Sequence, residues 1–164
     1  MDLKKRMAIA LVALLLSGCG GEEVFEIVED VWVQPVSAEV RQVTLTLPPE
    51  SASPVLENED GAVYVCDTYE VYQQILPPGD LSASVRAVSG YAPEELTMLK
   101  TDQGDTKRYD FVWVSAADSG DRVGKGCILD DGNYHYVLTV LGNADTAEEN
   151  RAVWQEILES FAIG

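Results

Sequence analysis

Residues 123–141 read VGKGCILDDGNYHYVLTVL, and this stretch decides the fold. Two segments rich in apolar and β-branched residues, 123–129 and 134–141, flank a short polar turn. Asp131 and Gly132 lie at the centre of that turn, and an Asp-Gly pair between two such segments predicts a tight β-hairpin. Counting outward from this turn pairs Leu129 with Tyr134, Ile128 with His135 and Cys127 with Tyr136.

The segment after the hairpin predicts a helix. Asp145 and Glu148, three residues later, form a capping-box-like pair. Apolar residues recur at helical spacing along one face: Ala147, Val153, Trp154, Ile157, Leu158 and Phe161. Gly124 and Gly126 share one face of the hairpin, and their missing side chains would let Trp154 approach the sheet closely. We therefore expect a long C-terminal helix on one face of the sheet, with Trp154 buried there.

Shorter elements precede the hairpin. Alternation of apolar and polar residues predicts strands within 24–36, 40–47, 62–75 and 109–115. Asp80 is a suitable N-cap for a helix over 81–88, which Gly90 would end. A short helical turn is expected over 93–99 and a loop over 101–106. This order predicts an α+β domain, with a mostly antiparallel sheet, a long C-terminal helix packed on one face and short helices mid-chain.

Three short stretches resemble the PsbP-like fold, which occurs in extrinsic proteins of photosystem II and in many small bacterial lipoproteins. They are LTLPP at 45–49, YVLT at 136–139 and SFAI at 160–163. The resemblance covers roughly residues 40–164. It implies a PsbP-like fold and a binding or assembly role, and it carries over no functional residue.

The first 19 residues resemble the leader of a bacterial lipoprotein. A basic start, Lys4-Lys5-Arg6, precedes an apolar run from Met7 to Leu16, which suits a signal-peptide core and is too short to span a bilayer. The run ends in Leu16-Ser17-Gly18-Cys19, which resembles a lipobox. We predict a signal peptide over 1–18, a lipidated tether over 19–23 and a single extracytoplasmic domain over 24–164. Cys19 is then the lipidation site that holds the chain on the cell membrane.

The charge restricts the partners. The chain carries 11 basic and 28 acidic residues, a net charge of −17. Without residues 1–18 it keeps 8 basic and 27 acidic residues, a net charge of −19. Such a chain repels phosphate backbones, so we expect no nucleic-acid binding. Membrane attachment must come from the lipid on Cys19, and the remaining partner classes are an envelope protein or a cationic ligand.

Two further cysteines leave two interpretations open. Cys66 and Cys127 could form a disulfide in an oxidising compartment, or both could be buried free thiols within strands. Neither has another cysteine or a histidine at metal-ligand spacing, so we expect no metal site and no cofactor.

The sequence contains none of the common motifs that mark a catalytic site. The one histidine, His135, falls in a hairpin strand, where a structural role is the usual one. No phosphate-binding loop, dinucleotide fingerprint or serine elbow is present. Tyr64 and Tyr72 would share one face of a continuous strand and could line a binding surface, or simply cover the sheet.

These observations predict a non-enzymatic, membrane-tethered binding or accessory module of the cell envelope. The alternatives are a carboxylate-dependent envelope hydrolase and a purely structural envelope protein. Two carboxyl groups facing each other across a cleft, one with a strongly raised pKa, would favour the hydrolase. A shallow aromatic surface would favour binding.

Overall fold

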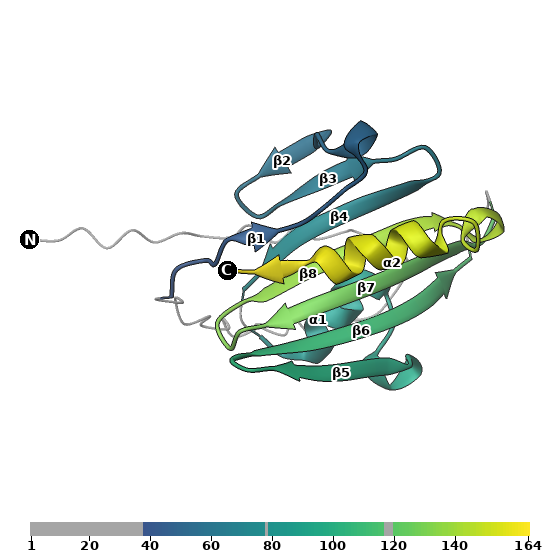
Figure 1. The fold of residues 1–164 in the computed structure, drawn as a ribbon. Coiled ribbons are helices and arrows are strands. Elements are labelled where there is room, and N and C mark those ends of the chain that lie inside the picture. Colours follow the sequence, from purple (N-terminus) through teal and green to yellow (C-terminus); the bar gives the residue numbers. More distant parts are fainter. Residues whose placement is uncertain (1–37, 78, 117–119) are drawn as a thin grey trace, which may run out of the picture. The chain divides into compact units, whose positions relative to one another are not determined.

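The computed structural model describes residues 38–77, 79–116 and 120–164, so the leader, Cys19 and the strand predicted within 24–36 lie outside the described residues. Seven antiparallel strands form the main sheet in the order β2-β3-β4-β8-β7-β6-β5 (Figure 1). Their bounds are β2 Leu56–Asn58, β3 Gly61–Val65, β4 Tyr69–Leu76, β5 Met98–Gln103, β6 Thr106–Ser115, β7 Arg122–Asp130 and β8 His135–Asn143. Two short strands, β1 Val43–Thr44 and β9 Ala162–Ile163, pair separately.

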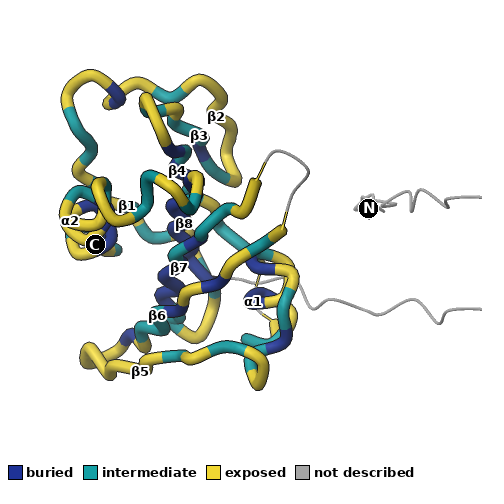
Figure 2. The backbone as a smooth tube through the Cα atoms, turned by 90° about the vertical axis from the view of Figure 1, so that its right-hand side faces the viewer, coloured by how far each residue is buried: buried dark blue, intermediate teal, exposed yellow. Residues whose placement is uncertain are grey.

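Each face of the main sheet carries one helix. Helix α1, Leu81–Ser89, covers one face, and helix α2, Arg151–Ser160, lies on the other face over β7 and β8 (Figures 1 and 2). The α2 side holds the larger core, in which Trp154, Tyr136 and Leu138 are fully buried. None of the described helices is both long and apolar enough to cross a membrane.

Helix α1 follows its local sequence closely. The Asp80 carboxylate accepts a hydrogen bond from the Ser82 amide, which satisfies one free N–H of the first turn. Gly90 ends the helix with φ of 81°, a conformation that favours glycine. The prediction of this helix and of both caps is confirmed.

The predicted fold class is wrong in its helical part. The described residues form mostly antiparallel sheet with two short helices of nine and ten residues, and residues 120–164 contain no long C-terminal helix. Asp145 does not cap α2, because Ala144–Thr146 form a separate 3-10 turn. The Asn150 side-chain amide donates to the Thr146 carbonyl and to the Thr68 hydroxyl, both at 2.9 Å. Because these bonds hold the turn in place, the regular helix begins only at Arg151.

The hairpin exists, but its predicted register is wrong by two residues. Leu129 pairs with Tyr136, where we expected Tyr134. The Asp131 carboxylate accepts hydrogen bonds from the amides of Asn133 and Tyr134, both at 2.8 Å. These bonds stabilise a longer turn over 131–134 in place of the two-residue turn. Because the shift is even, every side chain keeps its expected face of the sheet.

Gly124 and Gly126 of the hairpin do not make room for Trp154, as the sequence predicted, but for two other aromatic rings. Gly124 and Gly126 lie beneath the rings of Trp113 and Phe111, their partners on β6, on the α1 side of the sheet. Trp154 is fully buried, as predicted, but the glycine that it packs against is Gly142. Absent side chains therefore make room for an aromatic ring on both faces of the sheet.

Two further predictions concern the shorter elements. The β-rich stretch over 62–75, for which a break near Asp67 stayed open, forms the hairpin of β3 and β4, in which Tyr64 pairs with Val71 while Tyr72 pairs with Val63. Tyr64 and Tyr72 therefore lie on opposite faces and cannot form one surface. The loop expected over 101–106 contains the end of β5, a tight turn at Gly104 and the start of β6.

Candidate functional site

The α2 face of the sheet is only partly covered. The core beneath α2 comes from β4, β7 and β8, whereas β6 and β5 follow β7 at the far end of the strand order. Leu99 on β5 and Val112 on β6 are 66% and 50% exposed. A cavity of about 540 Å³ lies between α2 and strands β5, β6 and β7, and we call this cavity the α2 groove.

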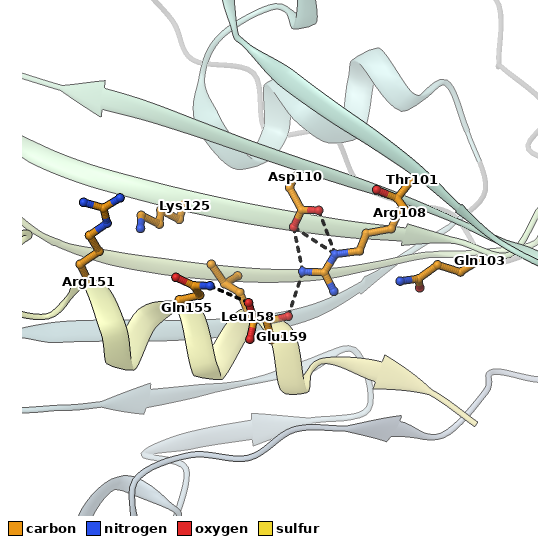
Figure 3. A pocket seen from close by; sticks show the side chains of 9 residues that line it. All are labelled: Thr101, Gln103, Arg108, Asp110, Lys125, Arg151, Gln155, Leu158 and Glu159. Carbon is orange, nitrogen blue, oxygen red and sulfur yellow. Dashed lines mark hydrogen bonds and ion pairs between the residues drawn. The ribbon is translucent and has the colours of Figure 1, made fainter.

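The sheet side of the α2 groove is polar. Thr101 and Gln103 come from β5, Arg108 and Asp110 from β6, and Lys125 from β7 (Figure 3). Alternate residues of a strand share a face, and the register places Thr101 directly opposite Arg108. The antiparallel pairing thus gathers on one surface side chains that are well separated in the sequence.

The helix side of the α2 groove is one stripe of α2. Arg151, Gln155, Leu158 and Glu159 recur at intervals of three or four residues, so they project from the same side of the helix (Figure 3). The Gln155 side-chain amide donates a 2.7 Å hydrogen bond to the Glu159 carboxylate. The helix therefore contributes one cation, one anion, one amide and one apolar side chain.

Arg108 is the best-fixed residue of the α2 groove. Its Nε and Nη2 nitrogens donate to both oxygens of Asp110, at 2.8 to 3.1 Å. Nη2 also donates to the Leu158 carbonyl at 2.9 Å, near the C-terminus of α2. A bidentate pair and a bond to a helix-terminal carbonyl hold the guanidinium rigidly and join the sheet to the helix.

The other two cations of the α2 groove are less constrained. Lys125 forms no ion pair with any described residue, and its Nζ lies 5.8 Å from the centre of the Trp154 ring. Arg151 pairs with Glu148 at 3.4 Å, but both side chains are largely exposed. An ion pair in water is weak, so this pair can open readily to admit a ligand.

An apolar hollow continues the α2 groove. This second cavity, of about 390 Å³, shares Asp110, Lys125 and Leu158 with the first. Its own lining includes Met98, Leu99, Phe111 and Val112. Because the two cavities share these three lining residues, we include the second cavity in the α2 groove, which then has a charged end and an apolar end.

A second cluster lies on the opposite face, around the one histidine. Ser84 Oγ on α1 is 2.6 Å from His135 Nδ1, and His135 Nε2 is 3.9 Å from Asp130. Burial lowers the pKa of His135, against the raising effect of Asp130, Asp131 and Asp80. Ser84 and His135 are only 6% and 4% exposed, so a substrate has no access to them. The cluster joins α1 to the sheet, which agrees with the structural role expected for His135.

The cysteines are not bridged in the structure. Cys66 and Cys127 are both free, and strands β4 and β8 lie between β7 and the end of β3. Three strand spacings of about 4.8 Å are more than twice the reach of a disulfide, about 7 Å between Cα atoms. Burial raises the pKa of Cys127 to about 12, so its thiol stays protonated and unreactive at neutral pH.

The two carboxylates of the α2 groove do not resemble a glycosidase pair. Asp110 is held by Arg108, and Glu159 accepts a bond from Gln155. Within the described part of the chain, no three His, Cys, Asp or Glu side chains gather as metal ligands. The arrangement can bind a ligand through its cations and apolar side chains.

Sequence reasoning missed this site. The sequence predicts a loop at Thr101 and Gln103, and the strand predicted over 109–115 excludes Arg108. Gly104-Asp105 between two β-rich segments was the available signal for the β5–β6 hairpin. The contributions of Arg151 and Glu159 needed the tertiary structure, because they depend on where α2 lies.

No protein-family model matches the chain, and no similar sequence was found among the curated proteins. The crystal structure of the Ran-binding protein Mog1p of Saccharomyces cerevisiae is similar, with a TM-score of 0.51 and 12% identity over 74% of this chain and 89% of Mog1p. LpqN, involved in cell envelope biogenesis of Mycobacterium tuberculosis, has a TM-score of 0.49 and 13% identity over 76% of this chain and 84% of LpqN. The likeness to Mog1p concerns the fold alone, and it does not confirm the PsbP-like resemblance.

Proposed function

We propose that this chain is a membrane-tethered, extracytoplasmic binding module of the cell envelope and that the α2 groove is its ligand site. The observation that carries the proposal is the groove itself. It combines a rigid guanidinium, two less constrained cations and an exposed apolar floor in neighbouring cavities of about 540 and 390 Å³. Sites for small ligands combine an apolar lining with a few fixed polar groups in this way.

The leader supports the location. Lys4 to Arg6, the apolar run and the lipobox-like Leu16–Cys19 occur in the order that a lipoprotein leader requires. A lipid on Cys19 and a tether of only a few residues would keep the domain close to the membrane surface. The strongly acidic surface then contributes solubility and gives no attraction to anionic lipids.

Binding is favoured over catalysis by the state of the reactive groups. Cys127 is held in its thiol form, and the Ser84–His135 pair is buried beneath α1. The groove carboxylates are engaged by Arg108 and Gln155. We therefore propose no hydrolase activity for this site.

A groove-blocking variant tests the proposal. The full chain is recovered from membranes in mild detergent and analysed by native mass spectrometry for a bound small molecule. Gln155→Trp places an indole in the α2 groove, whereas Glu156→Trp places the same indole on the neighbouring, exposed position of α2 that does not line the groove. The proposal predicts that the bound mass disappears from Gln155→Trp and persists in Glu156→Trp. Equal occupancy in both variants would show that the ligand binds elsewhere.

A further inference from the structure

The distribution of positive charge singles out the α2 groove. The chain without its leader has 8 basic residues, and three of them, Arg108, Lys125 and Arg151, line this groove. Arg41, Lys100 and Arg122 lie in other parts of the fold, where each also pairs with a nearby carboxylate. In a chain whose net charge without the leader is −19, three of the eight cations lie in this groove.

The cations of the groove differ in how far nearby carboxylates engage them. Asp110 pairs with Arg108, and Glu148 pairs with the exposed Arg151, so these two cations are balanced until a ligand displaces the exposed pair. Lys125 forms no ion pair with any described residue, although Glu159 also lines the groove. At physiological salt, charges beyond about 8 Å are largely screened, so a bound group senses these nearby cations more than the acidic surface.

The apolar end of the groove favours a ligand that also has an apolar part. Leu99 and Val112 lie on adjacent strands and are largely exposed, next to the shared lining residue Lys125. Covering such side chains stabilises a complex by about 25 cal/mol for each Å² of apolar surface removed from water. The groove therefore offers cation contacts and apolar contacts side by side.

We infer that the α2 groove binds a small amphiphilic anion, with its anionic head near Arg108, Lys125 and Arg151 and its apolar part along Leu99 and Val112. This inference rests on the proposed function, because it names the ligand class of the same groove. The net charge left a cationic ligand as one of two partner classes, and the positions of the cations favour an anionic ligand for this site. Arg108 Nη1 forms no hydrogen bond with a described residue, so the guanidinium that holds Asp110 still has donors for the head group.

Three probes that share one apolar body test the head-group preference. They are 4-phenylbutyrate, its neutral amide and the cationic 4-phenylbutylamine. Binding to the full chain in nanodiscs of zwitterionic lipid is measured by titration calorimetry, with empty nanodiscs as the blank. We expect the carboxylate to bind about tenfold more tightly than the amide and the amine most weakly, with a preference that shrinks as salt is added.

Matched variants locate the two ends of the ligand. Lys125→Gln and Arg151→Gln should each weaken 4-phenylbutyrate binding about two- to fivefold, as expected for partly exposed ion pairs. Lys107→Gln removes the same charge from the opposite face of β6 and should leave binding unchanged. Val112→Thr should weaken binding of all three probes, whereas Val114→Thr, equally exposed on the same strand but outside both cavities, should not.

The results separate this inference from the proposed function. Equal affinity for the carboxylate and the amide, or tighter binding of the amine, overturns the anionic head even when Gln155→Trp still removes the native ligand. An equal effect of Lys107→Gln and Lys125→Gln also overturns it, because the groove would then have no special role. A bound native mass that persists in Gln155→Trp overturns the proposed function itself.

Discussion

Gly142 should be coupled energetically to Trp154. A Cβ added at Gly142 would lie 2.7 Å from Cζ2 of the Trp154 ring and 3.1 Å from the Thr68 carbonyl oxygen. Ordinary contacts of this kind begin near 3.4 Å, so the ring would have to withdraw by about 0.7 Å. Trp154 is fully buried and packs edge-on against Tyr69 at 5.9 Å, which leaves it little space to move.

The expected magnitude follows from this contact. Overpacking a buried site costs about 1–3 kcal/mol, so Gly142→Ala should lower the free energy of unfolding by about 2 kcal/mol. Trp154→Phe removes the Cζ2 side of the indole and makes room for the methyl group. In the Trp154→Phe background, Gly142→Ala should cost less than about 1 kcal/mol, because only the Thr68 contact remains. The coupling energy is then about 1–2 kcal/mol.

Urea denaturation followed by circular dichroism measures the four free energies on residues 19–164 carrying Cys19→Ser. Gly124→Ala is the matched control, since its Cβ would clash with the ring of Trp113 on the opposite face. Gly124→Ala should destabilise the domain by the same amount whether residue 154 is Trp or Phe. Equal costs of Gly142→Ala in the two backgrounds would refute the packing of α2 described above. A coupling of Gly124 to Trp154 would instead favour the arrangement expected from the sequence.

Four further predictions concern single residues. The pKa of His135 in the folded state lies below its unfolded value of about 6.5 because of burial, so stability should fall as the pH drops below that value, and His135→Gln should flatten this part of the urea-measured pH profile. Arg108→Gln removes the bonds to Asp110 and to the end of α2, and urea unfolding should show a loss of about 2 kcal/mol. Thiol titration of the unreduced, unfolded chain should count both Cys66 and Cys127 as free, and their absence from the count would indicate a bridge. Cys19→Ala should abolish lipid labelling in cells, and labelling that persists would contradict the lipobox interpretation.

Local patterns predicted the elements whose stabilising contacts lie within a few residues. The helix at Leu81–Ser89 is specified by Asp80 and Gly90, which act on adjacent backbone groups. The turn near Asp131-Gly132 was visible for the same reason. The register of the β7–β8 hairpin could not be predicted in this way, because it depends on whether the Asp131 carboxylate bonds to the turn amides.

The site depends on contacts between distant parts of the chain, and these left weaker signals. Arg108 is bonded to the Leu158 carbonyl, 50 residues away. The Asn150 amide contacts Thr68, 82 residues away, in the turn that sets where α2 begins. Neither contact could be read from spacing, so the α2 groove was absent from the sequence-based predictions.

The sequence by itself determined the acidic charge, the central hairpin and the burial of Trp154, and it predicts a lipoprotein-like leader, because each is a property of composition or of a short periodic pattern. The tertiary structure decided the short length of α2, the glycine that receives Trp154 and the gathering of Arg108, Lys125 and Arg151 in one groove. The physical reason is that a strand or helix pattern fixes which side chains share a face. The neighbour that each face meets is set by strand order and by the position of the helix, and these follow from the packing of the whole domain.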